Sequence, residues 1–245
     1  MFNALVPLLV GSSPLLLCSG AAAYYATYAV RSQWLGRTDW HGRRDSKAVA
    51  LTFDDGPSPD TDRILDILAE HNLRATFFLI GRQVERFPQT ARQIALEGHT
   101  IGNHSYSHPI YLYRSPRETH RQLKQAQEVI SEATGIKPEF ARPPCGVRTP
   151  AYFSAARSLG LRTVQWDVAG FDWKSHPPGI IARSVLRRVR AGSIILLHDG
   201  DSDCKQDRRA TAEALPFIIT GLRSQGLRVV PLAELLSLDD EYRKS

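Results

Sequence analysis

The most constraining feature of the chain is a regular alternation between short, largely apolar runs and longer amphipathic stretches. The apolar runs are continuous rather than alternating in polarity, which is typical of parallel strands that are buried on both faces. We therefore predict seven buried strands. They span residues 48–54, 75–80, 100–103, 139–142, 162–166, 193–198 and 227–230.

The stretches between these runs contain helix signals. Ser115-Pro116-Arg117-Glu118 matches a capping box with proline at the first helical position, and Gly135 would end that helix. Further helices are predicted at 60–70, 180–190 and 211–223. Strands that alternate with helices imply α/β architecture with a parallel sheet. Seven such units favour a distorted or incomplete (β/α) barrel over an open doubly wound sheet.

Residues 1–30 form a separate segment without a single charged side chain. The segment is long enough to cross the roughly 30 Å hydrocarbon core of a bilayer. We predict a membrane anchor, with a cleaved signal peptide as the alternative, because Ala21-Ala22-Ala23 resembles a small-residue cleavage site. Tyr24 and Trp34 suit a membrane interface. Basic residues of the predicted linker 31–46 follow the segment, which leaves the orientation open.

Composition excludes several classes of protein. The net charge is +6, but the Lys and Arg residues are scattered, so we predict no nucleic-acid partner. The phosphate-binding patterns GxGxxG and GxxxxGK[ST] are absent, so we predict no nucleotide. Three cysteines in 245 residues are too few for a disulfide framework.

Polar residues gather where the predicted strands end. In a barrel of βα units the functional residues lie at the carboxyl ends of the strands. We therefore expect the candidate site at that end of the barrel. The clusters are Thr52-Phe53-Asp54-Asp55-Gly56-Pro57, Asn103-His104-Ser105-Tyr106-Ser107-His108, Arg142-Pro143-Pro144-Cys145-Gly146, Asp172-Trp173 after the fifth run, and Leu196-Leu197-His198.

Two of these clusters contain residues that are typical of a metal site. His104 and His108 are four apart, which would place both rings on one face of a helical turn. With one carboxylate they would form a two-His, one-carboxylate site for a divalent ion. A capping or core role is the alternative for the histidine pair alone.

The adjacent carboxylates Asp54 and Asp55 strengthen the metal interpretation. Both cannot easily be buried and ionised without a compensating cation. In an extended strand their side chains point to opposite sides, so that one can bind metal while the other transfers a proton. A solvated turn before Gly56 is the alternative.

Together and in this order, the five clusters resemble the motifs of the NodB-homology polysaccharide deacetylases (carbohydrate esterase family 4). The resemblance extends over residues 47–236 and leaves 237–245 as a polar tail. It implies a distorted (β/α) barrel that removes acyl groups from N-acylated amino sugars. It also implies one divalent metal ion, most often zinc, with cobalt, nickel or manganese as alternatives.

The resemblance assigns roles to individual residues. Asp55, His104 and His108 would hold the metal, whose Lewis acidity would polarise the acetamide carbonyl and activate water. Asp54 would be the catalytic base. Arg142 would pair with Asp54 and keep it ionised and aimed.

The remaining implied roles concern the leaving group and the substrate. His198 would protonate the leaving amine, and Asp172 would fix its tautomer and raise its pKa. The backbone N–H of Cys145 would stabilise the oxyanion. The family pattern has Tyr or Phe at this position; the thiol could reach the metal, be redox-sensitive or act as a small apolar filler. The implied substrate-binding residues are Pro144, Cys145, Trp173 and Leu196.

We therefore predict a metal-dependent hydrolase, anchored in the membrane and extracytoplasmic, that removes N-acetyl groups from an envelope polysaccharide such as peptidoglycan or a chitin-like oligosaccharide. Secretion after signal cleavage is the alternative location. One alternative function is deacylation or deformylation of a lipid-linked sugar. A second, of another class, is a catalytically silent glycan-binding protein. A two-metal phosphohydrolase would require more carboxylate ligands.

Overall fold

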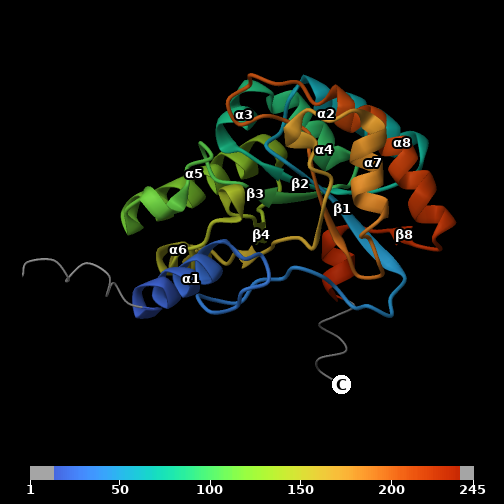
Figure 1. Cartoon of the computed structure of the whole chain (residues 1–245). Coiled ribbons are helices and arrows are strands. Elements are labelled where there is room, and N and C mark those ends of the chain that lie inside the picture. Colours follow the sequence, from blue (N-terminus) through green and yellow to red (C-terminus); the bar gives the residue numbers. More distant parts are fainter. Residues whose placement is uncertain (1–13, 238–245) are drawn as a thin grey trace, which may run out of the picture.

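The computed structural model describes residues 14–237, with side chains from residue 19 onward. Within this part of the chain, parallel strands form a curved sheet in the order β5-β4-β3-β2-β1-β7-β6, and β8 pairs with the start of β1 (Figure 1). The strands are β1 (Ala48–Asp54), β2 (Thr76–Leu79), β3 (Thr100–Asn103), β4 (Phe140–Ala141), β5 (Arg162–Thr163), β6 (Val168–Ala169), β7 (Ile194–His198) and β8 (Arg228–Val229).

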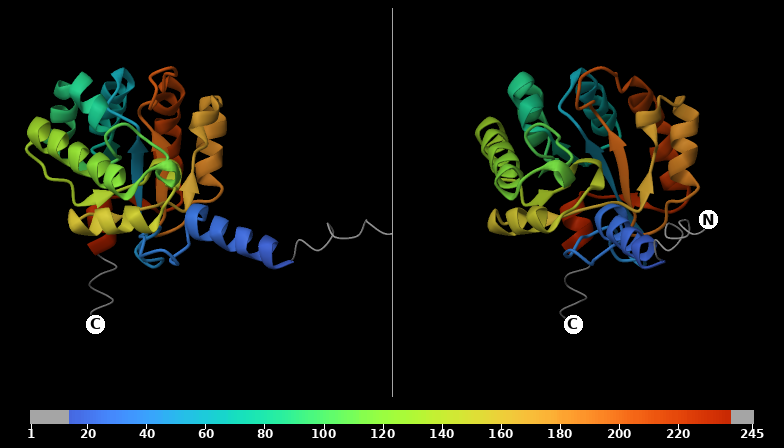
Figure 2. Two further views of the ribbon diagram at one scale, coloured as in Figure 1. Left: turned by 90° about the vertical axis from the view of Figure 1, so that its left-hand side faces the viewer. Right: turned by 60° about the vertical axis from the view of Figure 1, so that its left-hand side comes forward.

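The barrel is incomplete, as the sequence predicts. Strands β5 and β6 end the hydrogen-bonded path and do not pair with each other in the described part of the chain. Asp39, from the segment before β1, makes a parallel bridge with Val164 just after β5. The helices lie around the outside of the sheet, except the first, which projects away from one end of the barrel (Figure 2). They are α1 (Pro14–Tyr28), α2 (Pro59–Glu70), α3 (Gly81–Arg86), α4 (Pro88–Leu96), α5 (Pro116–Thr134), α6 (Pro150–Ser158), α7 (Pro178–Leu186) and α8 (Arg209–Ser224).

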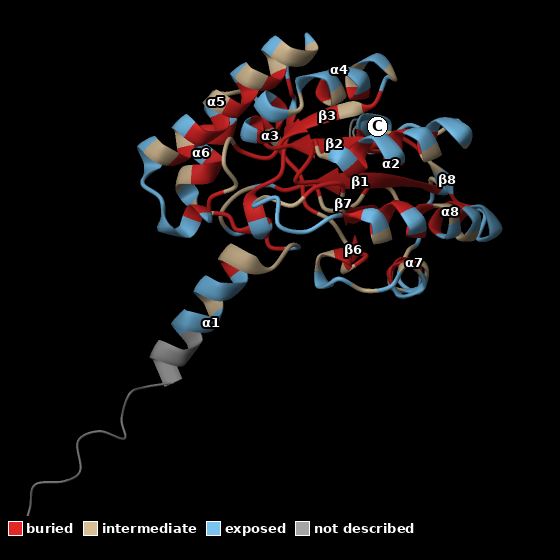
Figure 3. Cartoon of the chain, turned by 90° about the horizontal axis from the view of Figure 1, so that it is seen from above, coloured by how far each residue is buried: buried red, intermediate tan, exposed pale blue. Residues whose placement is uncertain are grey.

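Strand β1 lies at the centre of the core, and all seven of its residues are buried (Figure 3). Val49, Leu51 and Phe53 pack toward the helices, while Ala48 and Ala50 belong to a separate cluster inside the barrel. Successive side chains of a strand alternate between the two faces. A strand with apolar neighbours on both faces therefore reads as one continuous apolar run.

Helix α5 begins and ends where its capping residues predict. Ser115 Oγ accepts a hydrogen bond from Glu118 N at 3.2 Å, and Gly135 adopts the left-handed φ of 73° that ends many helices. The short helices α3, α4 and α6 were not predicted, because each is too brief to show a clear apolar period.

Strand β6 was also missed, and this changes the position of one cluster. Only Val168 and Ala169 pair in β6, against Ile195 and Leu196 of β7. Two paired residues are too few to give a periodic signal. Asp172 and Trp173 therefore follow β6 rather than the strand predicted at 162–166.

Helix α1 is the described part of the predicted membrane segment. It has 15 residues, and no helix between residues 14 and 237 is long and apolar enough to cross a membrane. The predicted transmembrane helix is therefore unsupported there, while residues 1–13 of that segment lie outside the described residues. The polar tail from residue 238 also lies outside them.

The C-terminal end of α1 is joined to the barrel by the buried guanidinium of Arg148. Arg148 Nη2 donates to Ala29 O at 2.5 Å and to Ala26 O at 3.4 Å, and its backbone N donates to Thr27 O at 3.1 Å. The partial negative charge at a helix C-terminus compensates the buried cation.

Candidate active site

Two adjacent carboxylates lie where β1 ends. Asp54 continues the inward-facing set of Ala48 and Ala50 and is 4% exposed. Asp55 has φ of 75°, a left-handed conformation that is uncommon for residues other than glycine, although aspartate adopts it more readily than most. Both carboxylates approach the same ring nitrogen, His104 Nε2, at 3.8 and 3.5 Å. The prediction that they point to opposite sides is wrong, because Asp55 is not in the extended conformation.

His104 and His108 lie close together, but not on a helical turn. The segment after β3 is a loop in which Ser105 and His108 have φ of 67° and 56°. Side-chain hydrogen bonds stabilise this loop: Ser105 N donates to Asn103 Oδ1 and His108 N donates to Ser105 Oγ, both at 2.9 Å. The four-residue spacing thus brings the rings together, although the predicted helical geometry is wrong.

The ring of His104 is oriented by the backbone. Its Nδ1 lies 2.7 Å from Arg142 O and therefore donates, which leaves Nε2 facing Asp55. Burial alone would lower the pKa of His104, but Asp54 and Asp55 outweigh it and raise the pKa, so a metal ion bound at Nε2 would take the place of a proton. His108 is suited to the same task, because burial lowers its pKa to about 4 against the opposing effect of Asp55. A neutral imidazole is the form that binds metal.

The donor set fits a small divalent ion. Asp55, His104 and His108 each offer one ligand atom, and these atoms lie within 4.8 Å of one another. Asp55 Oδ1 is 3.3 Å from His108 Nε2 and 3.5 Å from His104 Nε2, yet it makes no hydrogen bond within the described residues. Ligand atoms at about 2.05 Å from a tetrahedral ion are about 3.3 Å apart, which matches these spacings.

Arg142 places Asp54 beside this cluster. Its guanidinium is fully buried, and Nη1 donates to Asp54 Oδ1 at 2.7 Å and to Thr52 Oγ1 at 2.8 Å. Nη2 donates to Gln165 O at 3.2 Å. The Asp54 carboxylate therefore has a cationic partner and a fixed orientation, as a proton acceptor requires.

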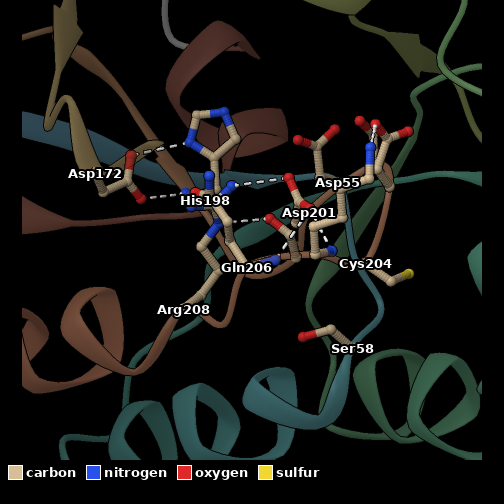
Figure 4. A network of polar contacts seen from close by, with 12 residues as sticks. Asp55, Ser58, Asp172, His198, Asp201, Cys204, Gln206 and Arg208 are labelled. Atoms are coloured by element: carbon tan, nitrogen blue, oxygen red, sulfur yellow. Dashed lines mark hydrogen bonds and ion pairs between the residues drawn. The ribbon is translucent and has the colours of Figure 1, made fainter. Parts of the chain in front are cut away.

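His198 and Asp172 form the second proton-transfer unit (Figure 4). His198 Nδ1 is 2.9 Å from Asp172 Oδ1, and His198 N donates to Asp172 Oδ2 at 2.7 Å. Thr211 Oγ1 donates to the same Oδ2 at 2.9 Å. Burial alone would lower the pKa of His198, but the Asp172 carboxylate outweighs it and raises the pKa to about 9. His198 is therefore protonated at neutral pH and able to act as an acid.

These residues share one cavity of about 390 Å³. Among the predicted substrate-binding residues, Cys145, Trp173 and Leu196 line it, whereas the buried Pro144 does not. Trp166, which was not among the predicted site residues, also lines the cavity. The lining residues are Asp54, Asp55, His104, His108, Cys145, Gly146, Trp166, Trp173, Leu196, His198, Asp201, Gln206 and Arg208.

Cys145 lines the cavity and has an unusual backbone conformation. It has φ of 54° and ψ of 16°, and its N–H makes no hydrogen bond within the described part of the chain. A free N–H at this position is the kind of donor that stabilises an oxyanion. Burial raises the pKa of the thiol, and the described residues that can hold a metal do not include Cys145. The alternative that the thiol binds the metal is therefore not supported.

Sequence reasoning missed Asp199. Its carboxylate is fully buried, accepts a hydrogen bond from Thr61 Oγ1 at 2.6 Å and packs against Gly56. Burial raises its pKa to about 7. The signal that could have identified it is its position directly after His198. Asp201, Gln206 and Arg208 gave no signal, because they lie in a polar stretch that resembles any solvated loop.

Comparisons with known proteins agree with this geometry. A family model described as polysaccharide deacetylase matches residues 41–164. The peptidoglycan-N-acetylglucosamine deacetylase of Bacillus cereus is 38% identical over 203 residues, covering 82% of this chain and 73% of the relative. The chitooligosaccharide deacetylase of a Bradyrhizobium strain is 36% identical, covering 78% of this chain and 91% of the relative.

Solved structures give the same result. The crystal structure of a peptidoglycan N-acetylglucosamine deacetylase aligns with a TM-score of 0.78 at 37% identity, over 82% of this chain and 92% of the other. The five clusters, their meeting point in one cavity and these similarities lead to one assignment. The chain belongs to the polysaccharide deacetylase family (carbohydrate esterase family 4), hydrolases that cleave the carbon–nitrogen amide bond of acetylated sugars.

Proposed function

We propose that the chain is a metal-dependent N-deacetylase of an envelope glycan of the peptidoglycan type. The observation that carries the proposal is the convergence of a metal-binding trio, a paired base and a protonated histidine on one cavity. The relatives described above act on peptidoglycan and chitooligosaccharides, both of which contain N-acetylglucosamine. Their shared chemistry supports the acetyl group as the one removed.

Asp55, His104 and His108 would hold the metal. When bound there, a divalent ion polarises the amide carbonyl and makes water a better nucleophile. Asp54 accepts a proton from the attacking water through the carboxylate that Arg142 holds in place.

The other residues act on the products of this attack. The free N–H of Cys145 donates to the developing oxyanion. His198 donates its proton to the leaving nitrogen, so that an amine departs rather than an amide anion. Trp173 packs edge-on against His198, with ring centroids 5.4 Å apart, and with Leu196 it provides an apolar wall for the acetyl methyl group.

The test is acetate release from N-acetylglucosamine oligomers. We expect chelation of divalent ions to abolish release, zinc to restore it, and His104→Ala to lower kcat/KM by at least about a thousandfold, because three ligands become two. His120→Ala, at a half-buried position of α5 that does not line the cavity, is the matched control and should behave as wild type. A His104→Ala variant as active as wild type would falsify the proposal.

A second part of the proposal concerns location. We propose that residues 1–30 attach the enzyme to the membrane, with the catalytic barrel on the extracytoplasmic side. The absence of charge in this segment and the 66% and 67% exposure of Tyr24 and Trp34 support the attachment. The extracytoplasmic side follows from the proposed envelope substrate. Cell fractionation and protease accessibility from outside test it. Acetate release from polyprenyl-linked sugars but not from polymeric glycan would favour the alternative that the substrate is a lipid-linked sugar.

A further inference from the structure

A second cavity, of about 530 Å³, adjoins the catalytic one. Asp201 and Gln206 line both cavities, so the loop after β7 forms the wall between them (Figure 4). The second cavity is lined by Ser58, Pro59, Asp60, Arg63, Arg86, Phe87, Asp201, Cys204, Lys205, Gln206, Asp207 and Arg209. This loop therefore separates the second cavity from the catalytic one.

The charges of this second cavity are unbalanced in one respect. Arg63 and Arg86 have no carboxylate partner among the described residues. The acidic lining groups, in contrast, are engaged. Asp60 Oδ2 accepts from Arg208 N at 2.6 Å, Asp201 Oδ1 is 3.4 Å from Arg208 Nη2, and Asp207 pairs with its neighbour Arg209 at 3.6 Å.

The wall of the cavity is preformed. Arg208 is 4% exposed and its Nε donates to Gly200 O at 2.7 Å, which ties the end of the loop to its beginning. Asp201 Oδ2 accepts from the backbone N–H groups of Lys205 and Gln206 at 2.7 and 3.2 Å. A ligand would therefore meet a built surface rather than order one, which lowers the entropic cost of binding.

From these observations we propose that the second cavity is a subsite for a carboxylate on the sugar or peptide next to the deacetylated residue. The proposal rests on the proposed function and adds a substrate preference to it. Arg63 and Arg86 have no carboxylate partner within the described residues, and a guanidinium group can bind a carboxylate through two parallel hydrogen bonds. A neutral chitin-like chain has no carboxylate to bind to either of these guanidinium groups. A glycan with N-acetylmuramic acid residues has a lactyl carboxylate on the adjoining sugar.

The experiment compares two substrates that differ only in charge. One is an oligosaccharide of alternating N-acetylglucosamine and N-acetylmuramic acid with free lactyl carboxylates, and the other has these groups converted to primary amides. We expect wild type to show a kcat/KM about tenfold higher for the free acid, and the preference to shrink at high ionic strength. In the Arg63→Gln, Arg86→Gln double variant the ratio should fall to about one.

Two controls isolate the local effect. Arg183→Gln removes one cation from a different cavity on α7 and should keep the wild-type ratio. Arg63→Gln alone should give an intermediate ratio; it leaves intact the contact between Arg86 Nη1 and Cys204 Sγ, 2.8 Å long, so the loop is undisturbed. Thermal unfolding midpoints verify that every variant is folded.

The outcomes separate clearly. A wild-type ratio near one with no preference for the stem-peptide substrate described next, or an equal fall in Arg183→Gln, overturns the subsite. A third substrate, with the lactyl carboxylates joined to stem peptides, identifies the source of the charge: a preference for it alone supports the subsite and assigns the carboxylates to the peptide. If the enzyme releases acetate from none of the substrates, including neutral oligomers, both the proposed function and the subsite are refuted.

Discussion

Replacing Asp172 by asparagine should move the alkaline limit of activity. The pKa of His198 lies at about 9 because the Asp172 carboxylate faces Nδ1 at 2.9 Å and outweighs burial. Asparagine keeps the size and one acceptor but removes the charge. Burial is then opposed only by the weaker effects of Asp55 and Asp54, and the pKa of His198 should fall to its ordinary value of 6.5 or lower.

The size of the effect follows from the protonated fraction of His198. At about pH 7.5 this fraction is about 97% for a pKa of 9 and about 9% for a pKa of 6.5, so kcat/KM should fall at least about tenfold. The deficit should narrow as pH decreases toward about 6. Stability shows the same linkage: the raised pKa stabilises the folded wild type below about pH 6.5, and this contribution is lost as pH rises through about 9.

The assay is the pH profile of kcat/KM for acetate release from N-acetylglucosamine oligomers. Thr211→Val is the matched control, because it removes the hydrogen bond to Asp172 Oδ2 at 2.9 Å and leaves the charge in place. The pH at which activity falls on the alkaline side of the profile should stay within about 0.3 of the wild-type value. If Asp172→Asn lowers kcat/KM equally at every pH and the alkaline side of the profile does not shift, the assignment of His198 as the acid is refuted.

Three further outcomes follow from the packing of the site. Arg142→Ala leaves the buried Asp54 without its cation and should lower the free energy of unfolding by about 3–5 kcal/mol, measured by urea denaturation; a change below about 1 kcal/mol would contradict the pairing. Gly56→Ala would place a Cβ 1.9 Å from Asp199 Oδ2, so we expect at least about 2 kcal/mol of destabilisation by calorimetry, and a wild-type transition would rule out this contact. Cys145→Gly relieves a left-handed φ and retains the N–H, so it should raise stability by about 1 kcal/mol with kcat within a few-fold; a large loss of kcat would show that the thiol itself is required.

Much of the architecture could be predicted from local patterns. The bounds of β1, residues 48 to 54, agree with its apolar run, because both faces of that strand are buried. Asp54 and Asp55 at the end of β1 lie in the cavity because the carboxyl ends of parallel strands all lie at one edge of the sheet.

The local backbone of the site could not be predicted. Asp55, Ser105, His108 and Cys145 all have positive φ, although none is glycine. A positive φ at these residues cannot be predicted from the local sequence, because contacts with residues far along the chain maintain it. For the same reason the sequence assigned the wrong local geometry to the two histidines while identifying the correct pair.

The burial of Arg148 has a practical consequence for any shortened form of the enzyme. A version that begins after Val30 would lack all the carbonyl groups that this guanidinium contacts, and would leave a cation stranded two residues beyond Gly146 in the cavity wall. Expression boundaries should therefore keep residues 24–30 even where the apolar leader is exchanged for another. Residues 26–30 and the cavity wall are thus joined by direct hydrogen bonds, so a change in one should be felt by the other.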